Sequence, residues 1–284
     1  MKQTEPVRYR TRSDIAVAGD VAGPRDGAPV LLLHGGGQTR GSWKDSLQTL
    51  AAVGYRGYAI DARGHGETSR DGHGDYTLDG FATDLVDVIG QIGAPPILIG
   101  ASLGGVISLL VAGEGGSSMA RALVLVDVAA RTNPYGVERI HNFMRANPNG
   151  FADVQEAADA VARYAHDRPR PSSTKGLERN LRKVGDRYYW HWDERFLDSW
   201  RPSHQAGLGR LEAAARRLEM PVLIVHAGKS DVIGEDEVDH LRALVPHAEY
   251  ARVENAGHMV VGDKNSEFNR AILDFLARRA PPRG

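Results

Sequence analysis

Short apolar runs alternate along the chain with stretches of helical spacing, and this feature limits its fold more than any other. Runs rich in Val, Ile and Leu occupy residues 29–33, 96–99, 122–126 and 221–225, with a weaker run at 57–60. They lack polar alternation, which is typical of strands covered on both faces in a parallel sheet. Apolar spacing of three and four residues predicts helices at 43–53, 78–92, 104–112, 235–245 and 268–277. The alternation predicts a doubly wound, mostly parallel α/β sheet, to which segments 7–11 and 14–18 add an antiparallel edge.

The alternation stops between residues 133 and 217. This stretch contains two amphipathic helical pieces, at 137–146 and 154–165, and no convincing buried strand. It also holds an aromatic cluster: Tyr188, Tyr189, Trp190, Trp192 and Phe196. We interpret residues 133–217 as a helical cap inserted into a core domain made of 1–132 and 218–284. A chain of 284 residues, 42% of them hydrophobic, is long enough to form such a core.

Composition excludes several classes of function. The 35 Lys and Arg residues nearly balance the 36 Asp and Glu residues, so no net charge draws the chain to nucleic acid or an anionic membrane. The absence of cysteine excludes disulfides, thiolate metal sites and cysteine nucleophiles. No signal-peptide core or membrane-spanning segment is visible. We therefore expect a cytoplasmic protein with a small-molecule partner; the sequence does not determine the oligomeric state and allows a homodimer.

The pentapeptide Gly100-Ala101-Ser102-Leu103-Gly104 follows one apolar run and precedes a predicted helix. This is the context of the G-x-S-x-G nucleophile elbow, a sharp strand-to-helix turn that exposes the serine. Residues flanking such a turn must lack bulk, and glycine stands at 100, 104 and 105. The turn also places the serine at a helix N-terminus, where free N–H groups favour a developing negative charge. The motif predicts Ser102 as a catalytic nucleophile.

A second glycine-rich turn, His34-Gly35-Gly36-Gly37, follows the apolar run at 29–33. Such a turn leaves backbone N–H groups uncovered, and the tetrahedral intermediates of acyl transfer need these donors. We select Gly36 and Leu103 as the oxyanion-hole donors, with Gly37 as the alternative to Gly36. A simple connecting turn would have the same composition. A phosphate loop is disfavoured because no Gly-Lys-Ser/Thr follows.

A serine hydroxyl needs a histidine to take its proton, and His258 is the best placed of eleven histidines. It follows the last predicted strand, at 249–253, and it comes after the serine and the acid in chain order. Asp231, on the loop after the 221–225 run, is the preferred acid that orients His258. Asp127, at the end of the 122–126 run, is the alternative.

Other polar and aromatic residues have less certain roles. We expect His34 to support the oxyanion turn and His65 to be a loop residue. Asp61 and Arg63 are expected to pair and brace that loop. His191 either touches substrate or packs within the cap.

The cap aromatics and one glycine are candidates for substrate binding: Gly37, Tyr189, Trp190 and Trp192. Equally, the aromatic rings would serve to fix the cap on the core.

Together these segments resemble the α/β-hydrolase superfamily over nearly the whole chain. The matching motifs are Leu-Leu-His-Gly-Gly-Gly at 32–37, Asp-x-Arg-Gly-x-Gly at 61–66, Gly-Ala-Ser-Leu-Gly-Gly at 100–105, Ser-Asp-Val at 230–232 and Ala-Gly-His-Met at 256–259. The resemblance implies an eight-stranded sheet, a helical cap after the sixth strand and chemistry that uses neither cofactor nor metal. Epoxide hydrolases and haloalkane dehalogenases look similar but use an aspartate nucleophile, so Ser102 argues against both activities.

Within that superfamily the chain looks like small capped esterases, lactonases and cofactor-free haloperoxidase-like perhydrolases. We expect hydrolysis of a small-molecule carboxylic ester or lactone through an acyl-enzyme on Ser102. Perhydrolysis or carbon–carbon bond hydrolysis would use the same triad. A binding protein that retains the pocket without turnover belongs to a different class, and an intact triad argues against it.

Overall fold

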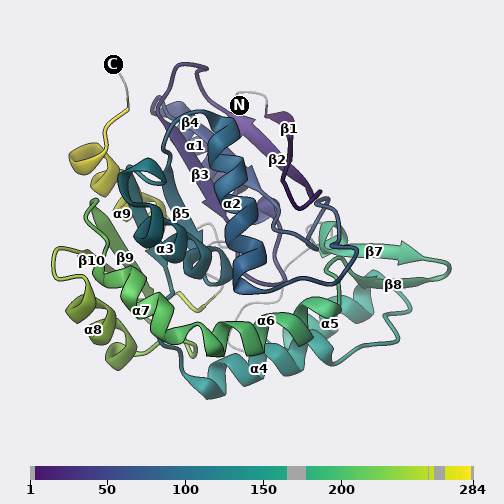
Figure 1. Cartoon of the computed structure of the whole chain (residues 1–284). Helices are drawn as coiled ribbons and strands as arrows, with labels where there is room; N and C mark the ends of the chain where they lie inside the picture. Colours follow the sequence, from purple (N-terminus) through teal and green to yellow (C-terminus); the bar gives the residue numbers. More distant parts are fainter. Residues whose placement is uncertain (1–3, 165–176, 255, 259–265, 283–284) are drawn as a thin grey trace.

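The computed structural model describes residues 4–164, 177–254, 256–258 and 266–282, and its centre is an eight-stranded sheet (Figure 1). The strand order is β1–β2–β4–β3–β5–β6–β9–β10, in which β2 is antiparallel to β1 and β4 and the other pairs are parallel. The strands are β1 (Glu5–Arg10), β2 (Ala16–Ala22), β3 (Pro29–Leu33), β4 (Arg56–Ile60), β5 (Ile97–Ala101), β6 (Ala122–Val126), β9 (Val222–Ala227) and β10 (Glu249–Val253). The predicted fold class, with its antiparallel edge, is confirmed.

Helices cover both faces of the sheet. One face packs against α2 (Leu78–Ile92), α3 (Leu103–Gly115) and α8 (Glu235–Leu244), and the other packs against α1 (Lys44–Ala52) and α9 (Ser266–Arg279). Neighbouring strand residues alternate between the two cores: Leu31 contributes to the first and Leu32 to the second. Both faces are therefore buried, which explains why the strands show no polar alternation. The described residues also form three short 3-10 helices, η1 (Arg40–Trp43), η2 (Gly116–Ser118) and η3 (Leu177–Asn180).

The chain between β6 and β9 forms a separate layer, which we call the cap. It contains α4 (Pro134–Arg145), α5 (Val154–Tyr164), α6 (Arg195–Ala206) and α7 (Leu208–Arg216). It also contains a two-stranded hairpin, β7 (Leu181–Val184) and β8 (Arg187–Trp190), which the expectation of a purely helical cap missed. Gly185, at φ +61°, and Asp186 form its two-residue turn. A Gly-Asp pair between residues of high strand propensity is a hairpin signal, so the sequence did contain it.

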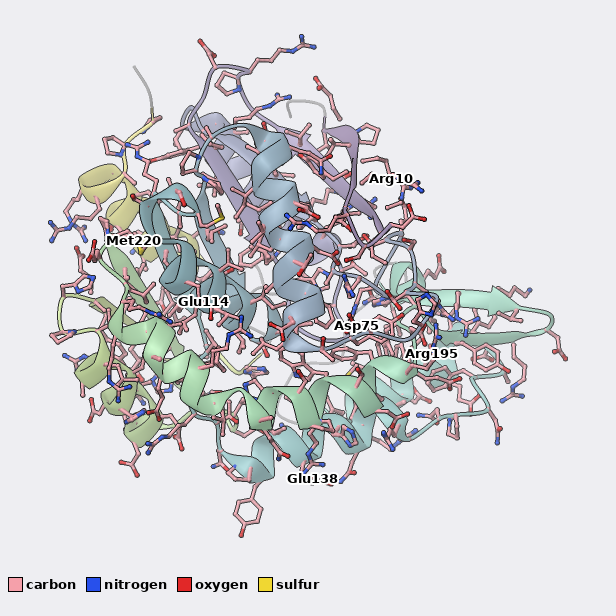
Figure 2. All side chains as sticks on the ribbon, viewed as in Figure 1. Arg10, Asp75, Glu114, Glu138, Arg195 and Met220 are labelled. Atoms are coloured by element: carbon pink, nitrogen blue, oxygen red, sulfur yellow. The ribbon has the colours of Figure 1, made fainter. Side chains whose placement is uncertain are left out.

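Ion pairs and hydrogen bonds attach the cap to the core at α6 and at α7; Figure 2 labels Arg195 of the first contact and Glu114 of the second. Near the start of α6, Arg195 donates to Asp193 and to the backbone of Asp71, and Asp193 accepts from the hydroxyl of Tyr76 at 2.7 Å. On α7, Arg210 forms a bidentate pair with Glu114 of α3. The cap therefore has defined contacts over the sheet edge at which β3, β5, β6, β9 and β10 end.

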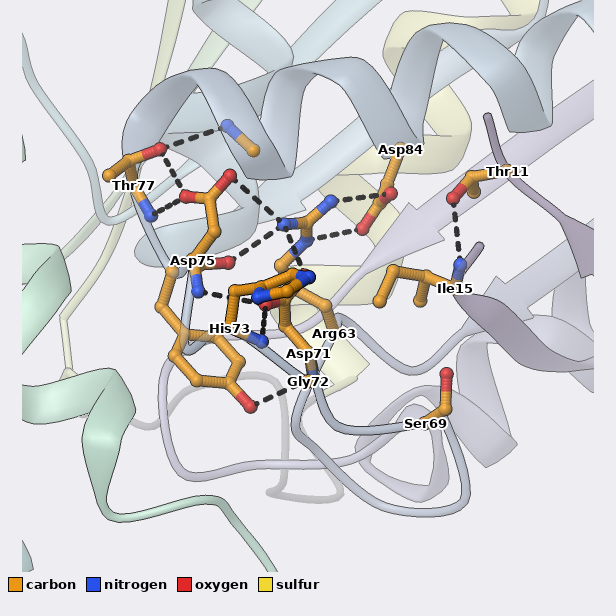
Figure 3. Close-up of polar contacts among 12 residues, drawn as sticks. Thr11, Ile15, Arg63, Ser69, Asp71, Gly72, His73, Asp75, Thr77 and Asp84 are labelled. Atoms are coloured by element: carbon orange, nitrogen blue, oxygen red, sulfur yellow. Dashed lines mark hydrogen bonds and ion pairs between the residues drawn. The ribbon is translucent and has the colours of Figure 1, made fainter. Parts of the chain in front are cut away.

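The loop after β4 is held by a buried arginine (Figure 3). Arg63 is fully buried and makes a bidentate ion pair with Asp84 of α2, at 2.6 and 2.8 Å, with Asp71 and Asp75 within 4 Å. The expected Asp61–Arg63 pair is wrong, because Asp61 pairs with Arg40. Asp61 contacts η1 and Arg63 contacts α2, so the two side chains attach the loop to two different helices.

Replacing Arg63 with methionine is expected to lower the free energy of unfolding by about 3–5 kcal/mol, because Asp84 would stay buried without its partner. Urea titration followed by circular dichroism measures the change. Arg8→Met is the control, since Arg8 and Glu67 form an exposed pair worth at most about 1 kcal/mol. Equal losses in the two variants would contradict the role assigned to Arg63.

No helix in the described part of the chain combines the length and apolar character needed to cross a bilayer.

Candidate active site

Ser102 lies at the sharp turn between β5 and α3, with φ 46° and ψ −116°. This backbone conformation is strained for a residue with a side chain and is kept only by tight surroundings. A Cβ at Gly100 would lie 2.4 Å from the carbonyl oxygen of Gly104, and one at Gly104 would lie 2.5 Å from that of Leu33. Strand, turn and helix therefore approach too closely for larger residues, as the elbow motif predicts.

His258 reaches the serine from the loop after β10. Its Nε2 lies 3.1 Å from Ser102 Oγ, and its Nδ1 lies 2.6 Å from a carboxylate oxygen, Oδ2 of Asp127. The structure thus brings the predicted serine and histidine together, and Asp127 completes the chain of hydrogen bonds. Nδ1–H donating to the carboxylate leaves Nε2 as the nitrogen that can take the serine proton. Met259, the last residue of the Ala-Gly-His-Met motif, lies outside the described residues.

Asp127 is a buried carboxylate with a full set of donors. Its side chain is 1% exposed and accepts from the N–H of Ala227 at 2.9 Å and the hydroxyl of Ser230 at 2.6 Å, besides His258. Its backbone adopts φ 49°, a left-handed conformation that Asp tolerates better than most residues. A buried carboxylate supported by three donors is suited to hold an imidazole ring and stabilise its charged form.

Asp231, the preferred acid in the sequence analysis, does not contact His258. Its carboxylate pairs with Arg139 of α4 at 2.7 Å and is 35% exposed. The turn after β9 directs Ser230 toward Asp127 instead, and the Ser230 hydroxyl also accepts from the N–H of Val232 at 3.2 Å. The assignment of the acid to Asp231 is therefore corrected to Asp127, the alternative on the neighbouring strand.

Gly36 and Leu103 line the same cavity as Ser102, and their backbone N–H groups have no hydrogen-bond partners among the described residues. The N–H of Leu103 is free because it begins α3. The N–H of Gly37, the alternative donor, instead donates to Nε2 of His65 at 3.2 Å. The geometry therefore favours Gly36 and Leu103 for holding an oxyanion.

In a comparison with known protein families, residues 28–265 match the alpha/beta hydrolase fold family. The chain belongs to this family. A non-heme chloroperoxidase of Kitasatospora aureofaciens is 28% identical over 266 residues, which cover 88% of this chain and 92% of that protein. An sn-1-specific diacylglycerol lipase of Mus musculus is 25% identical, covering 87% of this chain and 80% of that protein. In structure, the chain resembles E-2-(acetamidomethylene)succinate hydrolase, with a TM-score of 0.85, 20% identity and coverage of 97% and 100%.

In this α/β hydrolase a cavity of about 430 Å³ lies between the cap and the carboxyl ends of the strands. It opens onto Ser102, His258, Gly36 and Leu103. Its walls are mainly apolar, and the larger side chains among them are Val137, Ile140, Phe143, Met144, Tyr164, Trp192, Phe196, Leu197, Trp200 and Leu208. Its volume falls in the range of sites for small organic molecules.

The candidate substrate-binding residues divide into two groups. Gly37 and Trp192 line the cavity, whereas Tyr189 and Trp190 do not. Trp190 stacks behind Trp192 with ring centroids 5.0 Å apart, and Tyr189 packs beneath Arg182. The helices α4 and α6 supply most of the wall, which the sequence analysis missed. The amphipathic spacing of α4 was visible, but the cavity-facing side of a cap helix looks the same in sequence as a core-facing side. A helix at α6 was not predicted.

Three buried histidines lie behind the oxyanion turn. The ring centroids of His34 and His65 are 5.4 Å apart, and those of His65 and His191 are 5.8 Å apart. Burial lowers the pKa of all three rings, that of His65 to about 3 and that of His191 well below its ordinary value. None of the three lines the cavity, so His191 packs within the protein and is not part of the cavity wall.

The described residues contain no group of three or more His, Asp or Glu side chains arranged to hold a metal ion.

Proposed function

We propose that this α/β hydrolase cleaves a small-molecule carboxylic ester or lactone through an acyl-enzyme on Ser102. The observation that carries the proposal is the unbroken chain from Ser102 Oγ through His258 to the buried Asp127, with the unpaired N–H groups of Gly36 and Leu103 beside it. A nucleophile, a base with its orienting acid, and two oxyanion donors are the groups that acyl transfer requires.

The reaction follows from these positions. His258 Nε2 takes the proton of Ser102 Oγ as the oxygen attacks the ester carbonyl, and the two N–H groups stabilise the oxyanion. His258 then protonates the leaving alcohol, which forms the acyl-enzyme. Water, activated by the same nitrogen, releases the acid and restores the serine. Asp127 keeps the Nδ1 proton in place throughout and stabilises the charged ring.

The cavity supports a compact, largely apolar substrate. Aromatic side chains from α4, α5 and α6, with Trp192 after β8, line the space that opens onto Ser102, and its polar lining includes Gln38, Arg131 and His204 besides the catalytic set. An aliphatic or aryl acyl group would bury its surface there, which stabilises binding by about 25 cal/mol per Å² of apolar surface. We therefore place aryl esters and apolar lactones first among the substrates.

Perhydrolysis is the second candidate, and the similarity to a non-heme chloroperoxidase over most of both chains favours it. The acyl-enzyme would be the same, with hydrogen peroxide replacing water as acceptor and a peracid as product. Adding peroxide to the ester assay distinguishes the two reactions.

A panel of nitrophenyl esters of increasing acyl length, with small and macrocyclic lactones, tests the proposal. We expect turnover of at least one class and, where deacylation is the slower step, an initial burst of nitrophenol that approaches one equivalent per protein chain. Peracid formation in the presence of peroxide would move perhydrolysis ahead of hydrolysis. No turnover and no burst with any panel member would overturn both reactions and favour a binding protein.

A further inference from the structure

The three buried histidines hold successive peptide groups of the oxyanion turn, one ring for each group. His34 Nδ1–H donates to the carbonyl of Gly35 at 2.8 Å, His65 Nε2 accepts the N–H of Gly37 at 3.2 Å, and His191 Nε2–H donates to the carbonyl of Gly37 at 3.3 Å. The peptide groups 35–36, 36–37 and 37–38 are thus each oriented by a different imidazole.

The opposite nitrogen of each ring is also bonded, which determines the tautomer. His34 Nε2 accepts from the N–H of Ala62 at 3.0 Å, and His65 Nδ1–H donates to the carbonyl of Arg63 at 3.0 Å. His191 Nδ1 accepts from the N–H of Gly66 at 2.8 Å. Each ring therefore has one donor and one acceptor in use and must be neutral, which agrees with the lowered pKa of all three.

These bonds select which N–H faces the substrate. The carbonyl of Gly35 and the N–H of Gly36 belong to one planar trans peptide and point in opposite directions. Holding that carbonyl on His34 therefore aims the N–H of Gly36 away from the ring, toward the cavity that Gly36 lines. His65 occupies the N–H of Gly37 at the same time, which leaves Gly36 as the donor.

His34 and His65 belong to the core, but His191 belongs to the cap. It follows β8 directly and precedes Trp192, which lines the cavity, so one dipeptide contacts both the substrate space and the carbonyl of Gly37. The carbonyl of Gly37 is the only atom of the oxyanion turn for which the described structure records a hydrogen bond from a cap side chain.

We propose that His191 is a positioning residue through which the cap sets the orientation of the Gly36 N–H, so that correct seating of the cap raises kcat rather than substrate affinity. His191 holds the carbonyl of the peptide group 37–38, and the N–H of that group, at Gln38, donates to the carbonyl of Gly35 at 3.1 Å, on the peptide that carries the Gly36 N–H. This inference rests on the proposed hydrolase function, because it concerns the oxyanion donor of that reaction. A substitution in the cap hairpin would then alter the oxyanion donor, and with it kcat, without altering a contact with the substrate.

The test compares His191→Phe with His191→Gln on the best ester of the panel. Phenylalanine fills the space but cannot bond to Gly66 or Gly37, whereas glutamine can supply both a donor and an acceptor. We expect His191→Phe to lower kcat by about 10- to 100-fold with KM changed less than about threefold, below the cost of about 10²–10³ for deleting an oxyanion donor. We expect His191→Gln to recover most of kcat.

His247→Phe is the matched control, because it also removes an imidazole bond to a backbone carbonyl, that of Met220 at 3.0 Å, outside the cavity. We expect it to leave kcat within about twofold. A boronic acid inhibitor, which forms a tetrahedral adduct on the serine, should bind His191→Phe more weakly by about the same factor as kcat/KM falls.

The outcomes separate the two claims. If the wild type hydrolyses the ester and His191→Phe keeps the wild-type kcat, or shows only a raised KM, the role of His191 is overturned and the hydrolase proposal stands. If the wild type hydrolyses no ester, the hydrolase proposal fails, and an unchanged boronate affinity in His191→Phe would overturn the positioning role independently.

Discussion

Ser102→Ala is expected to lower kcat on the best ester of the panel by about 10⁶-fold, the loss found when the serine of a catalytic triad is removed. The proposed acyl-enzyme forms on Ser102 Oγ, and no other hydroxyl lies on His258 Nε2 in the described structure. Alanine lacks the hydroxyl oxygen from which His258 would take the proton. The remaining rate would therefore come from the oxyanion donors and substrate binding alone. Steady-state assays with an active-site titration of the wild type measure the change.

The variant should remain folded and should still bind ligand. Alanine is smaller than serine and enters a turn whose φ of 46° is already enforced by Gly100 and Gly104. Its melting temperature and its affinity for a non-hydrolysable ester analogue are therefore expected to stay near those of the wild type. A Ser102→Ala protein that keeps more than about a hundredth of the wild-type kcat would contradict the mechanism.

Asp127→Asn is expected to lower kcat by about 10⁴-fold, with little change in KM, because an amide favours the wrong tautomer of the histidine and cannot stabilise its charged form. Asparagine has nearly the same shape and tolerates the left-handed backbone of Asp127, at φ 49°. It can still accept from the N–H of Ala227. We therefore expect Asp127→Asn to lower kcat while the protein stays folded.

Asp231→Asn is the matched control for that variant. The carboxylate of Asp231 is partly exposed and pairs with Arg139 of the cap, away from His258. We expect kcat to stay within about threefold of the wild type, since an ion pair of this exposure contributes about 0–1 kcal/mol. A severe loss in Asp231→Asn with a mild one in Asp127→Asn would reverse the assignment of the acid.

The mostly parallel sheet, the sequence positions of its buried strands and the nucleophile elbow could be predicted from the sequence because each rests on local patterns. Apolar runs such as 29–33 and 122–126 identify doubly covered strands by themselves. The elbow needs only a strand, a Gly-rich turn around Ser102 and a helix, all within a few residues. The residues that signal each of these features are close together in the sequence.

The acid could not be chosen in the same way, because two carboxylates follow neighbouring strands at the same edge. Asp127 follows β6, which pairs with the strand of Ser102 through Ala101 and Val126, while Asp231 follows β9, one strand further away. The rotation of the turn after β9 then decides that Ser230 faces inward and Asp231 outward. Asp231 then pairs with Arg139 of α4, a contact between distant segments that no spacing rule encodes.

The residues that line the cavity could not be predicted from the sequence either. Trp192 and Trp190 are separated by one residue in an aromatic cluster, yet one lines the cavity and the other supports it from behind. His65 and His191 are 126 positions apart but bind the same glycine of the oxyanion turn. Pairings of this kind arise only when the cap is folded over the sheet.

Covalent labelling of the active protein is the most direct test of Ser102 as the nucleophile. The wild type is treated with a fluorophosphonate, which reacts with activated serines, and the modified peptide is located by mass spectrometry, with Ser102→Ala and Asp127→Asn treated in parallel. We predict one adduct, on Ser102, that forms quickly in the wild type, much more slowly in Asp127→Asn and not at all in Ser102→Ala. An adduct on another residue, or equal labelling of Ser102→Ala, would contradict it.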